Sequence, residues 1–276
     1  MIVIPILVYH SISADPPGWI APFTVTPQVF AHHLDLVLES DRTPMTVSEL
    51  QRALRGHTRL PSKPVVVTFD DGYADFAEAA STLASRNMPS TLYVTTGALQ
   101  SFGRRPTEAA LPPARMLEWS QLAKIEDTGV EIGAHTHTHP QLDTISIPAA
   151  AEEIRRCKDM LEDELGHKIS SFAYPFGYHS RRILREVQAV GYESACAVKN
   201  ALSSESDQVF ALSRLLIRAD TTSMQMAAWL AGHGAPIAPQ RERLRTKAWR
   251  TYRRLQRYRG FMATTTRRHA ASALQI

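Results

Sequence analysis

Two adjacent carboxylates are the first residues in this 276-residue chain whose type and spacing suit chemistry. Asp70 and Asp71 follow the hydrophobic run Pro-Val-Val-Val-Thr-Phe and precede Gly72, which permits a sharp turn. Two carboxylates at the end of a buried strand cannot both lie unpaired in a core, which indicates a shared pocket. A helix N-cap is the alternative interpretation, since aspartate is favoured there.

Three histidines form the second group. His135, His137 and His139 fall within five residues, just after a predicted strand. His135 and His139 are four residues apart, so a helical turn or a tight loop can direct both imidazoles at one ion. Imidazole suits zinc and other first-row divalent metals. A lone histidine favours a structural role, but a trio beside an Asp-Asp pair favours a metal site, with His137 pointing away from the ion or supporting a ligand.

A third segment, Phe-Ala-Tyr-Pro-Phe-Gly at 172–177, is a predicted strand that enters a turn. Tyr174, Pro175 and Phe176 would form a stiff apolar wall suited to a sugar ring or an acetyl methyl group. Taken alone, the segment is equally well explained as an ordinary turn at a strand end.

Short hydrophobic strands alternate with helices along the chain. We predict strands at 2–8, 64–69, 91–95, 130–133, 171–174, 193–198 and 209–217. We predict helices at 28–38, from a capping box at 46–49, and at 74–86, 118–128, 148–165, 180–190 and 222–231. This alternation predicts an α/β domain with a parallel sheet, most simply an α/β barrel. An insertion at 101–115 is expected to form part of the rim of the site.

Basic residues are concentrated at the C-terminal end. The segment 239–276 holds 11 of the 31 lysines and arginines and one of the 27 acidic residues, so it carries a net charge of +10 and the remainder −6. We predict a catalytic domain at 1–235 and a basic helical tail at 236–276. A helix over 241–259 suits an anionic membrane surface, and a solvated or disordered tail is the alternative. No recognition motif accompanies the charge, so no nucleic-acid partner is expected.

Composition excludes several classes of protein. Hydrophobic residues make up 44% and charged residues 21%, which is enough for an ordinary core. Cys157 and Cys196 are too few for a disulfide scaffold or a four-thiolate zinc site; we expect two buried thiols, with a single bridge as the alternative. No run reaches 18 apolar residues, and the apolar N-terminal run lacks the flanks of a signal peptide, so a cytoplasmic protein is expected.

The three segments, in this order, resemble motifs of the polysaccharide deacetylase family, also called the NodB homology domain or carbohydrate esterase family 4. The phrases Leu-Tyr-Val-Thr-Thr-Gly at 92–97 and Trp-Ser-Gln-Leu at 119–122 add to the resemblance, which covers roughly residues 1–232. It implies a distorted (β/α) barrel of about seven parallel strands. It also implies a metal-dependent hydrolase that removes N-acetyl groups from an N-acetylated amino sugar in a polysaccharide or glycolipid precursor. The alternatives are a hydrolase of an acetyl ester or small amide and a non-catalytic saccharide-binding relative.

The resemblance implies roles for the matching residues. Asp71, His135 and His139 would hold one divalent metal ion, with zinc expected and other first-row metals as alternatives. Asp70 would be the general base, and the backbone N–H of Tyr73 would help hold the oxyanion. Without a signal peptide, a cytoplasmic saccharide precursor is the expected substrate, with the basic tail holding the enzyme at the inner face of the membrane.

Two positions depart from the family pattern. Where the family often has an arginine that orients the base, this chain has Ala173, so either another cation replaces it or Asp70 is held by different bonds. The late Leu-x-His that supplies the general acid is also absent, and residues 212–218 read Leu-Ser-Arg-Leu-Leu-Ile-Arg.

An apolar strand that ends in His10 stands at the other end of the chain, and some exopolysaccharide deacetylases of the family resemble this permuted order. The first and last strands of a closed barrel are neighbours, so a strand moved to the N-terminus could deliver the same histidine. We therefore predict His10 as the general acid. A structural role at the strand end is the alternative, and His179 is the next candidate donor.

Overall fold

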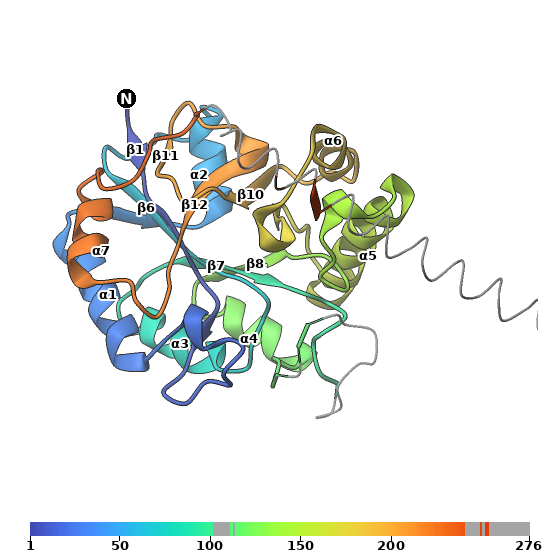
Figure 1. The fold of residues 1–276 in the computed structure, drawn as a ribbon, viewed down its shortest axis with the longest axis horizontal. Coiled ribbons are helices and arrows are strands. Elements are labelled where there is room, and N and C mark those ends of the chain that lie inside the picture. Colours follow the sequence, from blue (N-terminus) through green and yellow to red (C-terminus); the bar gives the residue numbers. More distant parts are fainter. Residues whose placement is uncertain (102–110, 113, 241–248, 250–251, 254–276) are drawn as a thin grey trace, which may run out of the picture.

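Seven parallel strands close into a barrel in the computed structural model, which describes residues 1–101, 111–112, 114–240, 249 and 252–253 (Figure 1). The order around the ring is β2-β12-β10-β9-β8-β7-β6, and β6 pairs back with β2. The ring strands are β2 (Ile6–Tyr9), β6 (Pro64–Phe69), β7 (Ser90–Val94), β8 (Val130–Ala134), β9 (Ser171–Ala173), β10 (Ser194–Val198) and β12 (Leu212–Leu216). The predicted barrel is confirmed.

The first strand of the ring closes the barrel. Leu7 of β2 lies level with Leu215 of β12 on one side and with Val67 of β6 on the other, in parallel register. All residues of β2 and β6 are buried. Each large apolar side chain buried there stabilises the folded state by roughly 1.5–3 kcal/mol. The first and last strands are therefore neighbours, as predicted.

Among the described residues, five short strands lie outside the ring: β1 (Val3–Ile4), β3 (Ser11–Ile12), β4 (Thr24–Val25), β5 (Thr43–Met45) and β11 (Ser203–Ser204). The last ring strand is shorter than predicted, because Val209–Ala211 forms a 3-10 turn. The Asp207 carboxylate accepts hydrogen bonds from the backbone N–H groups of Gln208 and Ser213, both at 2.8 Å, and so closes that turn.

Helices are distributed around the strands (Figure 1). The structure describes α1 (Pro27–Glu39), α2 (Val47–Leu54), α3 (Phe76–Ala84), α4 (Leu122–Glu126), α5 (Ile147–Leu165), α6 (Arg181–Ala189) and α7 (Ser223–Leu230). The predicted capping box is present, since Thr46 and Glu49 each accept the other's backbone N–H at the start of α2. No helix in the described part of the chain is long and apolar enough to cross a membrane.

The described ends of the insertion at 101–115 lie at the C-terminal end of β6. Leu111 and Met116 pack against Tyr73 and Ile20 in a small apolar cluster separate from the main core. This part of the insertion therefore borders the strand ends, while residues 102–110 and 113 lie outside the described residues.

Most of the predicted tail helix at 241–259 also lies outside the described residues. Within the described part, Arg253 donates to the Asp143 carboxylate at 2.9 Å and to the Gln141 side chain at 2.8 Å. Its guanidinium lies 3.5 Å from the centre of the Tyr178 ring. The two cysteines are free and buried, as expected.

Candidate metal centre and active site

The candidate residues converge at the carboxyl ends of the barrel strands, where parallel barrels build their sites. Asp70 directly follows β6, and its N–H donates to the Tyr9 carbonyl at the end of β2, at 3.0 Å. His135 directly follows β8, and its N–H donates to the Val94 carbonyl at the end of β7, at 2.9 Å. These bonds between strand ends bring the two motifs to one edge.

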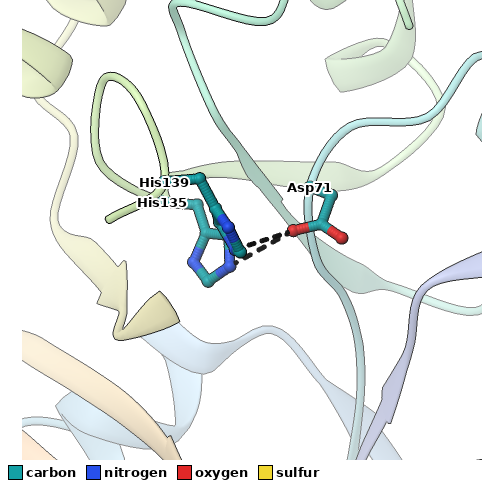
Figure 2. A group of neighbouring side chains, drawn as sticks. All are labelled: Asp71, His135 and His139. Atoms are coloured by element: carbon teal, nitrogen blue, oxygen red, sulfur yellow. Dashed lines mark ion pairs between the residues drawn. The ribbon is translucent and has the colours of Figure 1, made fainter. Parts of the chain in front are cut away.

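Asp71, His135 and His139 form a cluster that we call the metal-type group. Each residue offers one ligand atom, and these atoms all lie within 4.8 Å of one another (Figure 2). Asp71 Oδ1 lies 3.2 Å from His139 Nε2 and 3.5 Å from His135 Nε2. Burial raises the pKa of the Asp71 carboxyl, but the two facing histidines outweigh it and hold that pKa well below its usual value.

The hydrogen bonding around this group fits a divalent cation. His135 Nδ1 lies 2.8 Å from the Ala173 carbonyl oxygen, which can only accept, so Nδ1 carries a proton; the neutral form of the ring would therefore offer a metal ion its lone pair at Nε2. Asp71 Oδ1 is buried and has no hydrogen-bond partner within the described residues. Two imidazole nitrogens and one carboxylate oxygen form a donor set suited to zinc, with positions left open.

The backbone carrying these ligands is strained. Asp71, Thr136 and His139 have φ values of 76°, 68° and 63°, in the left-handed region. The histidine loop is supported from α5, because Thr138 donates to the Glu153 carboxylate from its N–H at 2.7 Å and from its hydroxyl at 2.6 Å. Strain held in place by such support is typical of functional sites.

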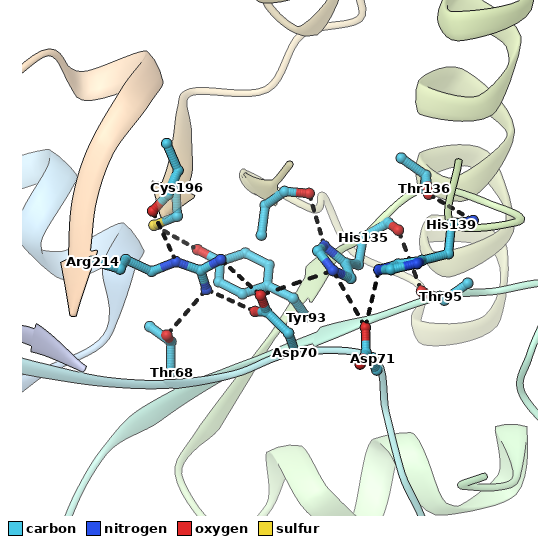
Figure 3. A network of polar contacts seen from close by, with 12 residues as sticks. Thr68, Asp70, Asp71, Tyr93, Thr95, His135, Thr136, His139, Cys196 and Arg214 are labelled. Carbon is cyan, nitrogen blue, oxygen red and sulfur yellow. Dashed lines mark hydrogen bonds and ion pairs between the residues drawn. The ribbon is translucent and has the colours of Figure 1, made fainter. Parts of the chain in front are cut away.

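Asp70 lies beside the metal-type group and is paired with Arg214 of β12 (Figure 3). Its Oδ1 and Oδ2 accept hydrogen bonds from Arg214 Nη1 and Nη2, each at 2.7 Å. Both side chains are buried. Burial raises the pKa of the Asp70 carboxyl, and Arg214 outweighs it, so that pKa lies below its usual value.

Sequence reasoning missed Arg214 as a functional residue. It also donates to Thr68 Oγ1 at 3.2 Å and to the Ala197 carbonyl at 3.3 Å, which fixes the guanidinium against Asp70. The signal was present, because an arginine inside the apolar strand Leu-Ser-Arg-Leu-Leu cannot be buried without a charged partner. Another cation therefore replaces the arginine that the family often has at position 173.

His10 lies at the end of β2, at the same edge of the barrel. Its side chain is partly buried, and its Nδ1 is buried with no hydrogen-bond partner in the described part of the chain. Burial lowers its pKa, and although Asp71 and Asp70 act to raise it, the pKa stays below its usual value. His10 therefore lies within electrostatic reach of both carboxylates.

Tyr73 lies just beyond the metal-type group. The chain from Gly72 to Ala74 pairs with Arg115–Leu117, where the insertion ends, since Leu117 N–H donates to the Gly72 carbonyl and Ala74 N–H to the Arg115 carbonyl. The N–H of Tyr73 between them has no acceptor within the described residues. The described residues therefore leave the hydrogen-bonding capacity of that amide unused.

The third segment differs in part from the expectation. Phe176 is 50% exposed and contacts the His139 ring at 4.8 Å between centroids. Tyr174 does not line the wall: it is fully buried, and its hydroxyl donates to the Phe210 carbonyl at 2.9 Å. Pro175 is also buried. Of the three residues, Tyr174 and Pro175 are therefore buried in the core, and only Phe176, within the turn that follows β9, is exposed.

His137 does not join the metal-type group. Its Nδ1 lies 2.9 Å from the hydroxyl oxygen of Thr96, and its carbonyl accepts from Gly97 N–H at 2.7 Å. It supports the loop that carries the two ligand histidines.

The fold and the site together define a (β/α)-barrel protein with a candidate two-histidine, one-aspartate metal centre at the carboxyl ends of its strands. The family model "Polysaccharide deacetylase" matches residues 57–195, and the chain belongs to this family. The match includes Asp70, Asp71, His135 and His139, whereas His10 and Arg214 lie outside it.

Comparison with individual proteins gives the same family. YxkH of Bacillus subtilis (strain 168), whose name places it among polysaccharide deacetylases, is 22% identical over 228 residues, which are 82% of this chain and 76% of YxkH. The Streptococcus pyogenes deacetylase PplD in complex with acetate has a TM-score of 0.70 and 25% identity, over 80% of this chain and 95% of PplD. IcaB from Ammonifex degensii has a TM-score of 0.69 and 21% identity, over 84% and 97%.

Proposed function

We propose that this protein is a metal-dependent N-deacetylase of an N-acetylated amino sugar within a polysaccharide or glycolipid precursor. The observation that carries the proposal is the buried Asp70–Arg214 pair beside the group of Asp71, His135 and His139. Family membership supports a saccharide substrate that bears acetyl groups. PplD, which shares the fold, is a deacetylase whose structure contains acetate, and acetate is the product of the proposed reaction.

A divalent ion, which we expect to be zinc, would be held by Asp71, His135 and His139 and would supply Lewis acidity toward water and the acetyl carbonyl. The Asp70 carboxylate accepts the proton of the attacking water. Arg214 serves this step by holding both carboxylate oxygens in one orientation and by keeping the carboxyl ionised.

The remaining protons and charges are handled by groups at the same edge. Attack of water on the acetyl carbon leaves a negative oxygen, and the unengaged N–H of Tyr73 donates a hydrogen bond to it. Cleavage of the C–N bond requires a proton at the amine nitrogen, which His10 donates. The products are acetate and the free amino sugar.

Two departures from the family pattern, Ala173 and the missing late histidine, favour the alternative of a non-catalytic saccharide-binding protein. Arg214 occupies the place of the expected cation against Asp70. His10 lies at the end of β2, the neighbour of β12 in the ring. The site therefore retains a group for each step, and this favours an enzyme over a binding module.

The charge of the C-terminal segment bears on where in the cell the enzyme acts. We propose that the basic segment 239–276, with its net charge of +10, attracts the protein to anionic lipid at the inner face of the membrane. A lipid-linked saccharide precursor in the cytoplasm would then be the natural substrate.

Acetate release tests the activity. Purified protein loaded with Zn²⁺ should release acetate from N-acetylated amino-sugar oligomers, whereas the Asp70→Asn variant should not. An acetylated xylan fragment tests the ester alternative. Release from the ester with none from any amino sugar would contradict the proposal, and failure on both substrates by a metal-loaded protein would favour the binding module.

A further inference from the structure

Tyr93 of β7 crosses the interior of the barrel and is fully buried. Its neighbours Leu92 and Val94 belong to the main core, whereas Tyr93 belongs to a separate apolar cluster, because successive side chains of a strand point to opposite faces. The Tyr93 hydroxyl lies 3.4 Å from the sulfur of Cys196 on β10, and β8 and β9 stand between those two strands in the ring. The side chain therefore reaches across the inside of the barrel.

Small residues on the intervening strands leave room for the Tyr93 ring. Gly133 lies level with Tyr93 on β8, and a Cβ at Gly133 would lie 2.5 Å from two carbons of that ring. Ala173 of β9 belongs to the same apolar cluster as Tyr93 and Cys196. The position where the family often has an arginine is thus occupied here by a small residue, in the cluster that the large tyrosine ring fills.

The Tyr93 ring faces the guanidinium of Arg214 (Figure 3). The guanidinium carbon lies 5.5 Å from the centre of the ring, within the distance at which a cation is attracted to an aromatic face. Both side chains are fully buried, and this attraction is stronger in a site without water.

The hydrogen bonds of Arg214 leave part of the guanidinium without an acceptor. Its two bonds to Asp70 are 2.7 Å long, and those to Thr68 and Ala197 are longer, at 3.2 and 3.3 Å. Together they use four of its five N–H groups, so one N–H on Nη2 has no acceptor among the described residues. The face of the Tyr93 ring therefore supplies part of the support that a buried cation needs.

We propose that Tyr93 is a positioning residue for the general base, because its ring holds Arg214 in the orientation that fixes Asp70. Tyr93 acts through Arg214 and does not touch the substrate. A guanidinium released from the ring could tilt, and the Asp70 carboxylate would then lose the orientation in which it meets the attacking water. This inference rests on the proposed deacetylase function.

Variants at position 93 separate the aromatic face from the hydroxyl and from the volume of the side chain. Tyr93→Phe keeps the face and removes the hydroxyl. Pentafluorophenylalanine at the same position keeps the ring but reverses the polarity of its face, and Tyr93→Leu removes the ring. Tyr192→Leu is the matched control, because Tyr192 is also buried and its ring also faces a buried cation, Lys158 of α5, at 4.6 Å.

We expect kcat to fall by about tenfold or more in Tyr93→Leu and in the pentafluoro variant, with little change in KM, since positioning of the base acts on the chemical step. Tyr93→Phe should keep most of the activity. Tyr192→Leu should lower the melting temperature but not kcat. The assays use Zn²⁺-loaded protein and N-acetylated amino-sugar oligomers. Elemental analysis and circular dichroism establish that each variant keeps its metal and its fold.

A double-mutant cycle with Arg214→Met distinguishes positioning from packing. If Tyr93 acts through Arg214, Tyr93→Leu should lower kcat in the wild-type background and add little in the Arg214→Met background. A second readout needs no turnover. In ¹⁵N-labelled protein, the Nε–H resonance of Arg214 is identified by its loss in Arg214→Met, and it should move in Tyr93→Leu but stay near its wild-type position in Tyr93→Phe.

Unchanged kcat in both the pentafluoro variant and Tyr93→Leu would overturn the inference and leave the deacetylase function intact. Equal losses in Tyr93→Phe and Tyr93→Leu, or additive losses in the cycle, would overturn it as well. If Tyr93→Leu does not fold, the pentafluoro variant, which keeps the ring, decides the outcome. Absence of acetate release from every amino sugar by the wild-type protein would instead reject the proposed function, and this inference with it.

Discussion

Asp70 and Arg214 are joined by two parallel hydrogen bonds of 2.7 Å, although they lie 144 residues apart in the chain. The paired forks of a carboxylate and a guanidinium fix the orientation of both groups. β2 lies between the strands that carry them, so the contact exists only because the barrel is closed by β2. The position of a cation in the linear sequence is therefore a poor guide to the place it occupies at the edge of a closed ring.

Replacing Arg214 should change the pH profile of the enzyme. A general base must be ionised, so activity falls as pH drops through the pKa of Asp70. Arg214 holds that pKa below its usual value against the effect of burial. In Arg214→Met the effect of burial is opposed only by His135 and His10, so the acid limb of kcat/KM should move to higher pH, and the maximum should fall by about 10²-fold or more.

The same variant should lose stability, because removal of one partner leaves a buried carboxylate unpaired, at a cost of about 3–5 kcal/mol. With the pair intact, the lowered pKa of Asp70 stabilises the folded protein at every pH above the pKa that this carboxyl has in the unfolded chain. This stabilisation is lost as the pH falls through the pKa of Asp70 in the folded protein. Arg155→Met, on the exposed face of α5, is the control. An acid limb unchanged in Arg214→Met would refute the positioning role.

The barrel and the metal-type group were predictable from the sequence because their signals are local. Each strand is a short apolar run; Asp71 and His135 lie at the ends of two such runs, and His139 follows His135 by four residues. Parallel strands place their carboxyl ends at one edge, so the three residues had to meet there.

Arg214 and the orientation of Tyr174 were not predictable in the same way. The partner of a buried arginine depends on which strands face each other across the ring, and the sequence of one strand does not specify this. Tyr174 is extended and keeps the facing of Phe172, two residues before it, whose ring lies 5.3 Å from its own; which side of β9 the main core covers depends on how the helices pack there. Both features depend on tertiary packing.

Metal content should depend on three residues and not on their neighbours. We expect about one divalent ion per chain in the wild-type protein, and strongly reduced content in Asp71→Asn, His135→Ala and His139→Ala, measured by elemental analysis. Asp70→Asn should keep the ion while losing activity by roughly 10²–10⁴-fold.

His137→Gln is the matched control for metal content. His137 belongs to the same loop and is buried, but it lies against Thr96 and not in the group of three. Full metal content in His139→Ala, or its loss in Asp70→Asn, would reverse the proposed assignment of roles.

The basic tail should be dispensable for folding. Truncation belongs after residue 240, because the Ala238 N–H donates to the Leu202 carbonyl at 2.8 Å and its carbonyl accepts from Ser204 Oγ at 2.6 Å. We expect the protein without 241–276 to remain active on soluble oligomers and to bind anionic vesicles less, with the difference largest at low salt.

Arg253→Ala in the full chain separates docking from membrane attraction. It removes the contact with Asp143 but only one of the eleven positive charges, so it should lower the melting temperature slightly while vesicle binding persists. Equal vesicle binding by the full-length and truncated proteins would rule out attachment through the tail.

His10 should matter most when the leaving group needs a proton. An amine leaves an amide only when it is protonated, whereas a phenolate leaves an activated acetyl ester without help. His10→Ala should therefore keep its metal and fold, lose about 10²-fold or more of its activity on the amide, and lose much less of its activity on 4-nitrophenyl acetate.

Because burial lowers the pKa of His10, the proton is available only at lower pH than for an ordinary histidine, and the basic limb of the amide pH–rate profile should flatten or move in the variant. His179→Ala is the comparison, since its ring stacks on buried Tyr174 at 4.8 Å. If His10→Ala hydrolyses both substrates at near wild-type rates while His179→Ala loses only the amide, the proton donor is His179, and the strand carrying His10 serves only to close the barrel.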